Sequence, residues 1–189
     1  MTKEQLFLSG SAHSAFHQHW TLDSHITFLN HGSFGACPKV VLETQYQWRQ
    51  RLERQPLQFL GKEIEPLLDQ AREVLASFVG ADAEDLVFVS NATTGVNTVL
   101  RSLQFQPSDE LLTTNQEYNA CRNALNFVAE QEGLRVVVAD VPFPVASPEQ
   151  VMQAVLEKVT DKTRLVLLDH VTSQTGLIFP IADLVQTLN

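Results

Sequence analysis

The sequence predicts an α/β fold with a mostly parallel sheet. From residue 86 onward, short apolar stretches of strand length alternate with longer stretches whose apolar residues recur at helical spacing. This alternation is typical of βαβ units, in which helices cover a parallel sheet. Strands are expected at 86–90, 110–114, 135–139 and 164–169, and helices at about 94–103, 119–131, 148–159 and after Pro180.

We expect three parts along the chain: an N-terminal arm at 1–25, a helical segment at 26–80 and the α/β region at 81–189. The arm is polar and irregular. Its histidines show no cysteine or carboxylate spacing that would suit a metal, so they are interpreted as solvated. They are His13, His17, His19 and His25.

The middle segment begins with a predicted short strand at 26–29. Helices are predicted at 39–53 and 62–78, because apolar residues recur there at helical spacing, with a break around Pro56. Gly80 is expected to cap the second helix. A group of arginines near the first helix end could bind a carboxylate, but solvated helix charges explain them better. They are Arg49, Arg51 and Arg54.

Composition excludes several functional classes. The net charge of -9 and pI near 5.0 argue against nucleic-acid binding, which needs a basic face. No apolar run approaches the roughly 18 residues of a membrane span, and Met1 to Gly10 do not resemble a secretory signal. Cys37 and Cys121 form no CxxC pair. We therefore expect a cytoplasmic protein with reduced thiols.

Polar segments follow three of the expected strands, and ligands of parallel sheets bind at such strand ends. Asn91 to Thr94 lie where a helix begins, so backbone N–H groups, the helix dipole and two hydroxyls could hold a phosphate. Alternatively, Thr93 or Thr94 only N-caps that helix. Tyr118 offers a flat ring for stacking, and residues 169–176 supply hydroxyls, an amide and an imidazole. Together they predict a pocket.

Four segments of the chain resemble the pyridoxal-phosphate enzymes of aminotransferase class V. They read FLNHGSFGACP, VSNATTGVNTVL, EYNAC and DHVTSQTGLIFPI, in the family's order. They are most similar to its isopenicillin N epimerase-like branch. The resemblance implies a three-layer α/β/α large domain of fold type I, incomplete here, that binds pyridoxal 5'-phosphate. It also implies a homodimer with residues of both subunits in each site.

The resemblance also implies roles for particular residues. Ala92, Thr93 and Thr94 match the phosphate-binding turn. Tyr118 matches the position that stacks on the pyridine ring. Ser173 matches the position that faces the phenolic oxygen of the cofactor.

A further match concerns the substrate. Asn30, His31 and Gly32 match the segment that lies near it, and from the residues alone this glycine-containing turn is either functional or a plain turn. Relatives often carry His at the position of Gln116, so the role of that position is open.

For Asp169, the residue chemistry and the family resemblance imply different roles. A carboxylate at a strand end could pair with a pyridinium nitrogen, but the family's aspartate lies one strand later, so Asp169 is expected to be structural. Pyridoxal-phosphate chemistry also needs a lysine that forms a Schiff base. None of the lysines matches the family's position, which lies beyond Asn189. The lysines are Lys3, Lys39, Lys62, Lys158 and Lys162.

The function predicted by the resemblance is therefore that of an enzyme acting on an amino acid or amine, by transamination, epimerisation or C–S bond cleavage. Cys37 and Cys121 are poor candidates for a desulfurase's sulfur-accepting cysteine. Two alternatives stay open here: a truncated, non-catalytic protein that binds a phosphate ligand or partner, and a different α/β enzyme that binds a sugar phosphate. The isolated chain is expected to be marginally stable or to associate through open strand edges.

Overall fold

The computed structural model describes residues 14–188. The chain forms two compact units, Met1–Val87 and Phe88–Asn189. Each unit is described by itself.

The first unit is helical. Gly80 ends the longest stretch of helix in the left-handed conformation (φ 72°), which confirms its predicted role as a cap. The predicted strand at 26–29 is wrong: these residues are irregular, and Ile26 and Leu29 are exposed. The elements are 3-10 helix η2 Ala15–His19, α1 His31–Phe34, α2 Lys39–Arg54, α3 Pro56–Gln58, π-helix η3 Phe59–Glu63, α4 Ile64–Val79 and 3-10 helix η4 Ala83–Asp85.

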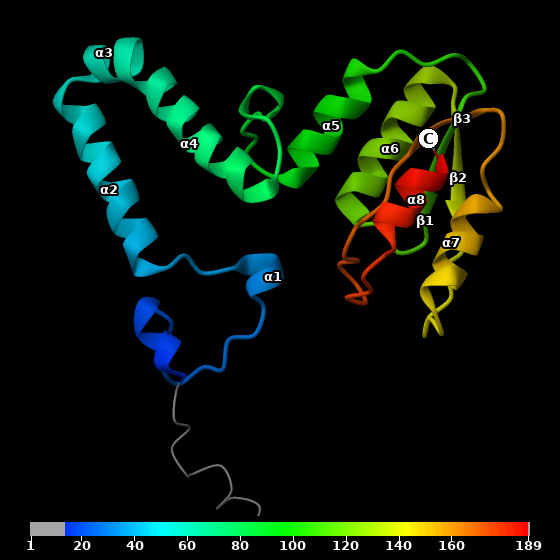
Figure 1. Ribbon diagram of the computed structural model, residues 1–189, viewed down its shortest axis with the longest axis horizontal. Helices are drawn as coiled ribbons and strands as arrows, with labels where there is room; N and C mark the ends of the chain where they lie inside the picture. Colours follow the sequence, from blue (N-terminus) through cyan, green and yellow to red (C-terminus); the bar gives the residue numbers. More distant parts are fainter. Residues whose placement is uncertain (1–13, 189) are drawn as a thin grey trace, which may run out of the picture. The chain divides into compact units, whose positions relative to one another are not determined.

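The second unit has a parallel sheet of three strands in the order β2-β1-β3 (Figure 1). Gly133, again left-handed, ends the helix between the first two strands. The α/β class and the parallel sheet are confirmed. The elements are α5 Ala92–Ser102, β1 Glu110–Thr114, α6 Asn119–Glu132, β2 Arg135–Ala139, α7 Pro148–Leu156, β3 Thr163–Val166 and α8 Ile181–Leu188.

Helices cover both faces of this sheet, which gives three layers. Successive side chains of a strand point to opposite faces. Leu111 of β1 packs in a cluster with Leu100 of α5 and Leu125 of α6. Its neighbour Leu112 packs in the other cluster, with Val155 of α7 and Leu184 of α8. Because β1 is buried along its whole length, it forms the centre of the unit.

Polar side chains join β1 to its neighbours at both ends. At the amino end, the buried Glu110 carboxylate accepts hydrogen bonds from Arg135 Nη1 (3.1 Å) and Thr160 Oγ1 (2.6 Å). At the carboxyl end, the Asn115 amide donates to the Val141 carbonyl (3.1 Å) and accepts from the Val141 N–H (3.0 Å). These bonds lie on either side of the apolar layers.

The strand predicted at 86–90 does not form. Residues 86–89 have no assigned secondary structure, and Val87 is 80% exposed. Phe88 and Val89 are also largely exposed. A strand requires a neighbour that accepts and donates its backbone hydrogen bonds, and within residues 14–188 the sheet has only the strands β1, β2 and β3. The strand prediction for 86–90 is therefore wrong, because these residues have no strand partner within the described part of the chain.

Residues 14–188 contain neither a membrane-spanning helix nor a cluster of metal ligands. No helix in this part of the chain is long and apolar enough to cross a membrane. No group of three or more His, Cys, Asp or Glu residues in this part could hold a metal ion. His13 and the first ten residues, on which two of the predictions above rest, lie outside the described residues.

Candidate functional site

The helix that was expected to bind a phosphate begins at Ala92, and its N-cap is Asn91. The Asn91 side chain accepts from the Thr94 N–H (2.9 Å), and its carbonyl accepts from the Gly95 N–H (3.2 Å). The alternative in which Thr93 or Thr94 caps the helix is therefore wrong. Asparagine is among the strongest N-cap residues because its short side chain reaches the first-turn amides.

The first turn of α5 still offers hydrogen-bond donors at its positive end. Asn91 accepts hydrogen bonds from the N–H groups of Thr94 and Gly95. The N–H groups of Ala92 and Thr93, which come before them, have no hydrogen-bond acceptor within the described residues. The Thr94 hydroxyl lies 3.1 Å from both Ser90 Oγ and Asn91 Oδ1. The Thr93 side chain lies close enough to the Cys121 thiol of α6 to offset part of the rise in that thiol's pKa. The helix start predicted from the sequence is therefore present, and its binding of a phosphate stays a prediction.

Tyr118 lies between the end of β1 and the start of α6, where it is the N-cap residue. Its backbone N–H donates to Asp169 Oδ2 (3.0 Å), and its side chain is 44% exposed. Asp169 follows β3, so this bond links two adjacent strand ends. The expectation that Asp169 is structural agrees with this contact, because its carboxylate binds a backbone amide. The Tyr118 ring remains accessible for stacking.

Glu117, beside Tyr118, is a carboxyl group that the sequence argument did not single out. It is only 4% exposed, and its Oε2 accepts from Thr113 Oγ1 (3.2 Å). Burial, and then the nearby Asp169 carboxylate, raise the pKa of Glu117 to about 7. Burial also raises the pKa of Asp169. Burial, and then the nearby Glu117 carboxylate, raise the pKa of the Cys121 thiol. Cys121 is therefore a poor nucleophile at neutral pH.

A hairpin-like loop carries Ser173 to the same edge. An isolated antiparallel bridge joins Val171 to Ile178. The loop is tied to the end of β1 by a hydrogen bond from Thr175 Oγ1 to Gln116 Oε1 (3.0 Å). Gln116 is buried, and this bond gives its side-chain oxygen a partner, while the role of the position stays open.

Comparisons with known proteins match this arrangement. A family model, aminotransferase class-V, matches residues 27–189. The chain belongs to this family. Isopenicillin N epimerase of Amycolatopsis lactamdurans is 38% identical over 163 residues, which are 85% of this chain and 41% of that protein. A probable chloroplastic L-cysteine desulfhydrase of Arabidopsis thaliana is 30% identical over 94% of this chain and 40% of that protein.

A solved structure shows the same fold. It is the K223A mutant of C-DES with glycine covalently linked to its pyridoxal-phosphate cofactor. The TM-score is 0.76 at 26% identity, covering 88% of this chain and 45% of that one. The chain thus spans less than half the length of the relatives it matches.

The residues predicted to lie near the substrate belong to the first unit, whereas the strand-end residues belong to the second. Asn30 precedes the short helix α1, which His31 and Gly32 begin. The His31 ring meets the Phe28 ring edge-on, at 4.7 Å between centroids. All three predicted residues are exposed. Their role near a substrate stays a prediction.

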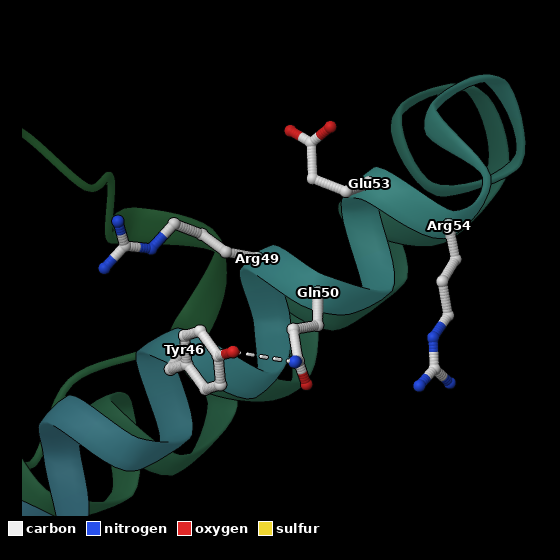
Figure 2. A pocket seen from close by; sticks show the side chains of 5 residues that line it. All are labelled: Tyr46, Arg49, Gln50, Glu53 and Arg54. Atoms are coloured by element: carbon white, nitrogen blue, oxygen red, sulfur yellow. Dashed lines mark hydrogen bonds between the residues drawn. The ribbon is translucent and has the colours of Figure 1, made fainter.

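The arginines of α2 do not form one anion site. Figure 2 shows a hollow lined by side chains of this helix alone, with Arg49 and Arg54 extending away from each other. Arg51 instead pairs with Glu63 (2.8 Å) and lies over the Trp48 ring (5.3 Å). They are therefore surface charges, as the sequence interpretation favoured.

Sequence reasoning missed Glu117 and Cys121 as parts of this site, although the segment EYNAC holds both. The signal for Glu117 was its position: an ionisable residue shortly after a buried strand lies at the edge of the sheet, where it needs partners.

Proposed function

We propose that this chain contributes the phosphate- and ring-binding part of a pyridoxal-phosphate enzyme that acts on an amino acid or a related amine. One observation carries the proposal: the donors at the start of α5 and the accessible Tyr118 ring lie on neighbouring elements. Leu100 of α5 and Leu125 of α6 pack in one buried cluster, which holds these neighbouring elements together. Family membership supports it, as does the cofactor in the C-DES structure.

The residues present fit such a cofactor. The amides of Ala92 and Thr93, with the Thr94 hydroxyl, would hold the phosphate at the positive end of α5. Tyr118 would stack on the pyridine ring, and Ser173 would face the phenolic oxygen. When bound, pyridoxal phosphate supplies an electron sink for bonds at the substrate's α-carbon.

The reaction of the whole enzyme is part of the proposal. The relatives named above are an epimerase and a probable desulfhydrase, so transamination, epimerisation and C–S cleavage are all proposed classes. In the second unit, Lys158 and Lys162 lie near the amino end of β3, opposite the candidate site. We therefore propose that the lysine and the pyridinium acid come from outside the described residues. The homodimer and the cytoplasmic location remain predictions.

The phosphate site can be tested by titrating pyridoxal phosphate into the chain and following its absorbance. Pyridoxal, which lacks the phosphate, is expected to bind about tenfold or more weakly, a difference of about 1.4 kcal/mol or more. The double variant Thr93→Ala/Thr94→Ala should lose that difference. Thr98→Ala is the matched control, because its hydroxyl binds the Thr94 carbonyl within the same helix (2.9 Å).

Equal affinity for pyridoxal and its phosphate would contradict the proposed site. Preferential binding of a sugar phosphate would instead favour the α/β enzyme of a different class. The non-catalytic alternative is not favoured, because the family members named here are enzymes.

A further inference from the structure

Two carboxyl groups meet beneath the candidate ring-binding residue. Glu117 lies at the end of β1, and Asp169 lies beyond β3. The backbone N–H of Tyr118, the residue next to Glu117, donates to Asp169 Oδ2 at 3.0 Å, so the two carboxyl groups lie at the same end of the sheet. Both are acceptors when ionised, so a hydrogen bond between them requires a proton on one of the two. Among the described residues, no donor lies within hydrogen-bond distance of the buried Glu117 Oε1.

We propose that Glu117 and Asp169 share one proton, and that the resulting acid–carboxylate pair holds the Tyr118 backbone in place. Glu117 is then a positioning residue for the Tyr118 ring. The inference deepens the proposed function, on which the role of that ring rests.

The groups around the two carboxyls favour Glu117 as the one that carries the proton. From β1, the Thr113 hydroxyl occupies Oε2 (3.2 Å). From α6, the Cys121 thiol is neutral, and the Arg122 guanidinium, which donates to the Thr114 carbonyl (3.1 Å), partly offsets the negative charge. Burial and Asp169 outweigh it and raise the pKa of Glu117 to about 7. A proton on Glu117 would also give the unpartnered oxygen a role as donor to Asp169.

Asp169 is the better site for the negative charge. Its Oδ2 already accepts from the Tyr118 N–H at 3.0 Å, and a hydrogen bond to a charged acceptor is stronger than one to a neutral acceptor. Losing the shared proton would place two carboxylates side by side at a buried edge. The contact that holds Tyr118 would then be strained by repulsion.

The test is a ¹³C NMR titration of the chain labelled at glutamate side-chain carboxyls, with the Glu117 signal identified by its absence in Glu117→Gln. We expect its midpoint near 7, and the ¹⁵N signal of the Tyr118 amide should follow the same midpoint. In Glu117→Gln, whose amide can donate permanently to Asp169, the Tyr118 signal should no longer move over that range. Glu130→Gln, exposed on the helix α6 that follows Tyr118, is the matched control and should leave both curves unchanged.

A second variant tests whether the two groups are coupled. Asp169→Asn removes the like charge but keeps an acceptor for the Tyr118 N–H, so the Glu117 midpoint should fall while burial keeps it above 4.5. An unchanged midpoint would overturn the shared proton. A wild-type midpoint near 4.5, or a Tyr118 amide signal that ignores Glu117, would also overturn the inference.

These results separate the inference from the proposed function. The titration uses no cofactor, so an ordinary Glu117 midpoint together with tight pyridoxal-phosphate binding refutes only the pair. A midpoint near 7 without any preference for pyridoxal phosphate over pyridoxal refutes only the proposed function.

Discussion

Replacing Glu117 by glutamine is expected to change how the stability of the chain depends on pH. The pKa of Glu117 is about 7 in the folded chain, against an ordinary value of 4.5. Between these two values the folded state binds more protons than the unfolded state, so the free energy of unfolding falls as pH rises. The stability that Glu117 contributes through its raised pKa is fully present below pH 4.5, and it is lost as the pH rises through about 7.

The size of the effect follows from the two pKa values. Their difference corresponds to at most about 3 kcal/mol, since one pKa unit is equivalent to about 1.4 kcal/mol. Glutamine keeps the shape and the hydrogen-bonding capacity of the protonated acid but does not ionise. The wild-type chain should therefore lose stability relative to Glu117→Gln as pH rises, and Asp169, whose pKa is also raised, acts in the same direction.

Urea unfolding at a series of pH values, followed by circular dichroism, measures this difference directly. Subtracting the variant from the wild type removes the contribution of the titratable groups that both chains share. The exposed Glu130→Gln control should give a difference that does not change with pH. A Glu117→Gln difference that is flat, or that grows in favour of the wild type as pH rises, would refute the reasoning.

Three further predictions concern the framework around the site. Asn91→Ala removes the N-cap bond of α5 and should cost about 1 kcal/mol of stability in urea unfolding; a cost near zero would show that α5 is not held by this cap. Leu112→Ala, at a fully buried position, should cost about 2–5 kcal/mol, whereas Val87→Ala, largely exposed, should cost less than about 0.5 kcal/mol; equal costs would contradict the assigned core. Sedimentation should show self-association through the exposed residues 87–89, and a stable compact monomer would contradict it.

The sequence predicted the core of the second unit well because its local signals agree. The predicted bounds of 110–114 and 135–139 match β1 and β2, since each contains a short apolar stretch, Leu111-Leu112 in β1 and 136–139 in β2. Gly133 ends α6 in the left-handed conformation that glycine adopts most easily. Where apolar period, glycine position and turn residues coincide, local sequence determines the element.

Other predictions failed where the outcome depends on a neighbour. The stretches 26–29 and 86–90 have strand-like composition, but pairing decides whether a strand forms, and a single sequence does not show the partner. The hydroxyls of Thr93 and Thr94 suggested that one of these residues caps α5, whereas the N-cap is Asn91. The raised pKa of Glu117 depends first on burial and then on Asp169, which lies far along the chain, and both arise only on folding.

The bonds at the two ends of β1 have a consequence for how the sheet selects its alignment. A strand buried on one face resists sliding, because a slip by one residue would expose its apolar side chains. β1 is apolar toward both faces, so Leu111 and Leu112 could exchange places at little hydrophobic cost. Glu110 and Asn115 prevent this, because each meets its partners on the neighbouring strands in only one alignment. Alignment in this sheet is thus encoded by two polar residues that flank the apolar layers, and the same alignment brings Glu117 and Asp169 to one edge.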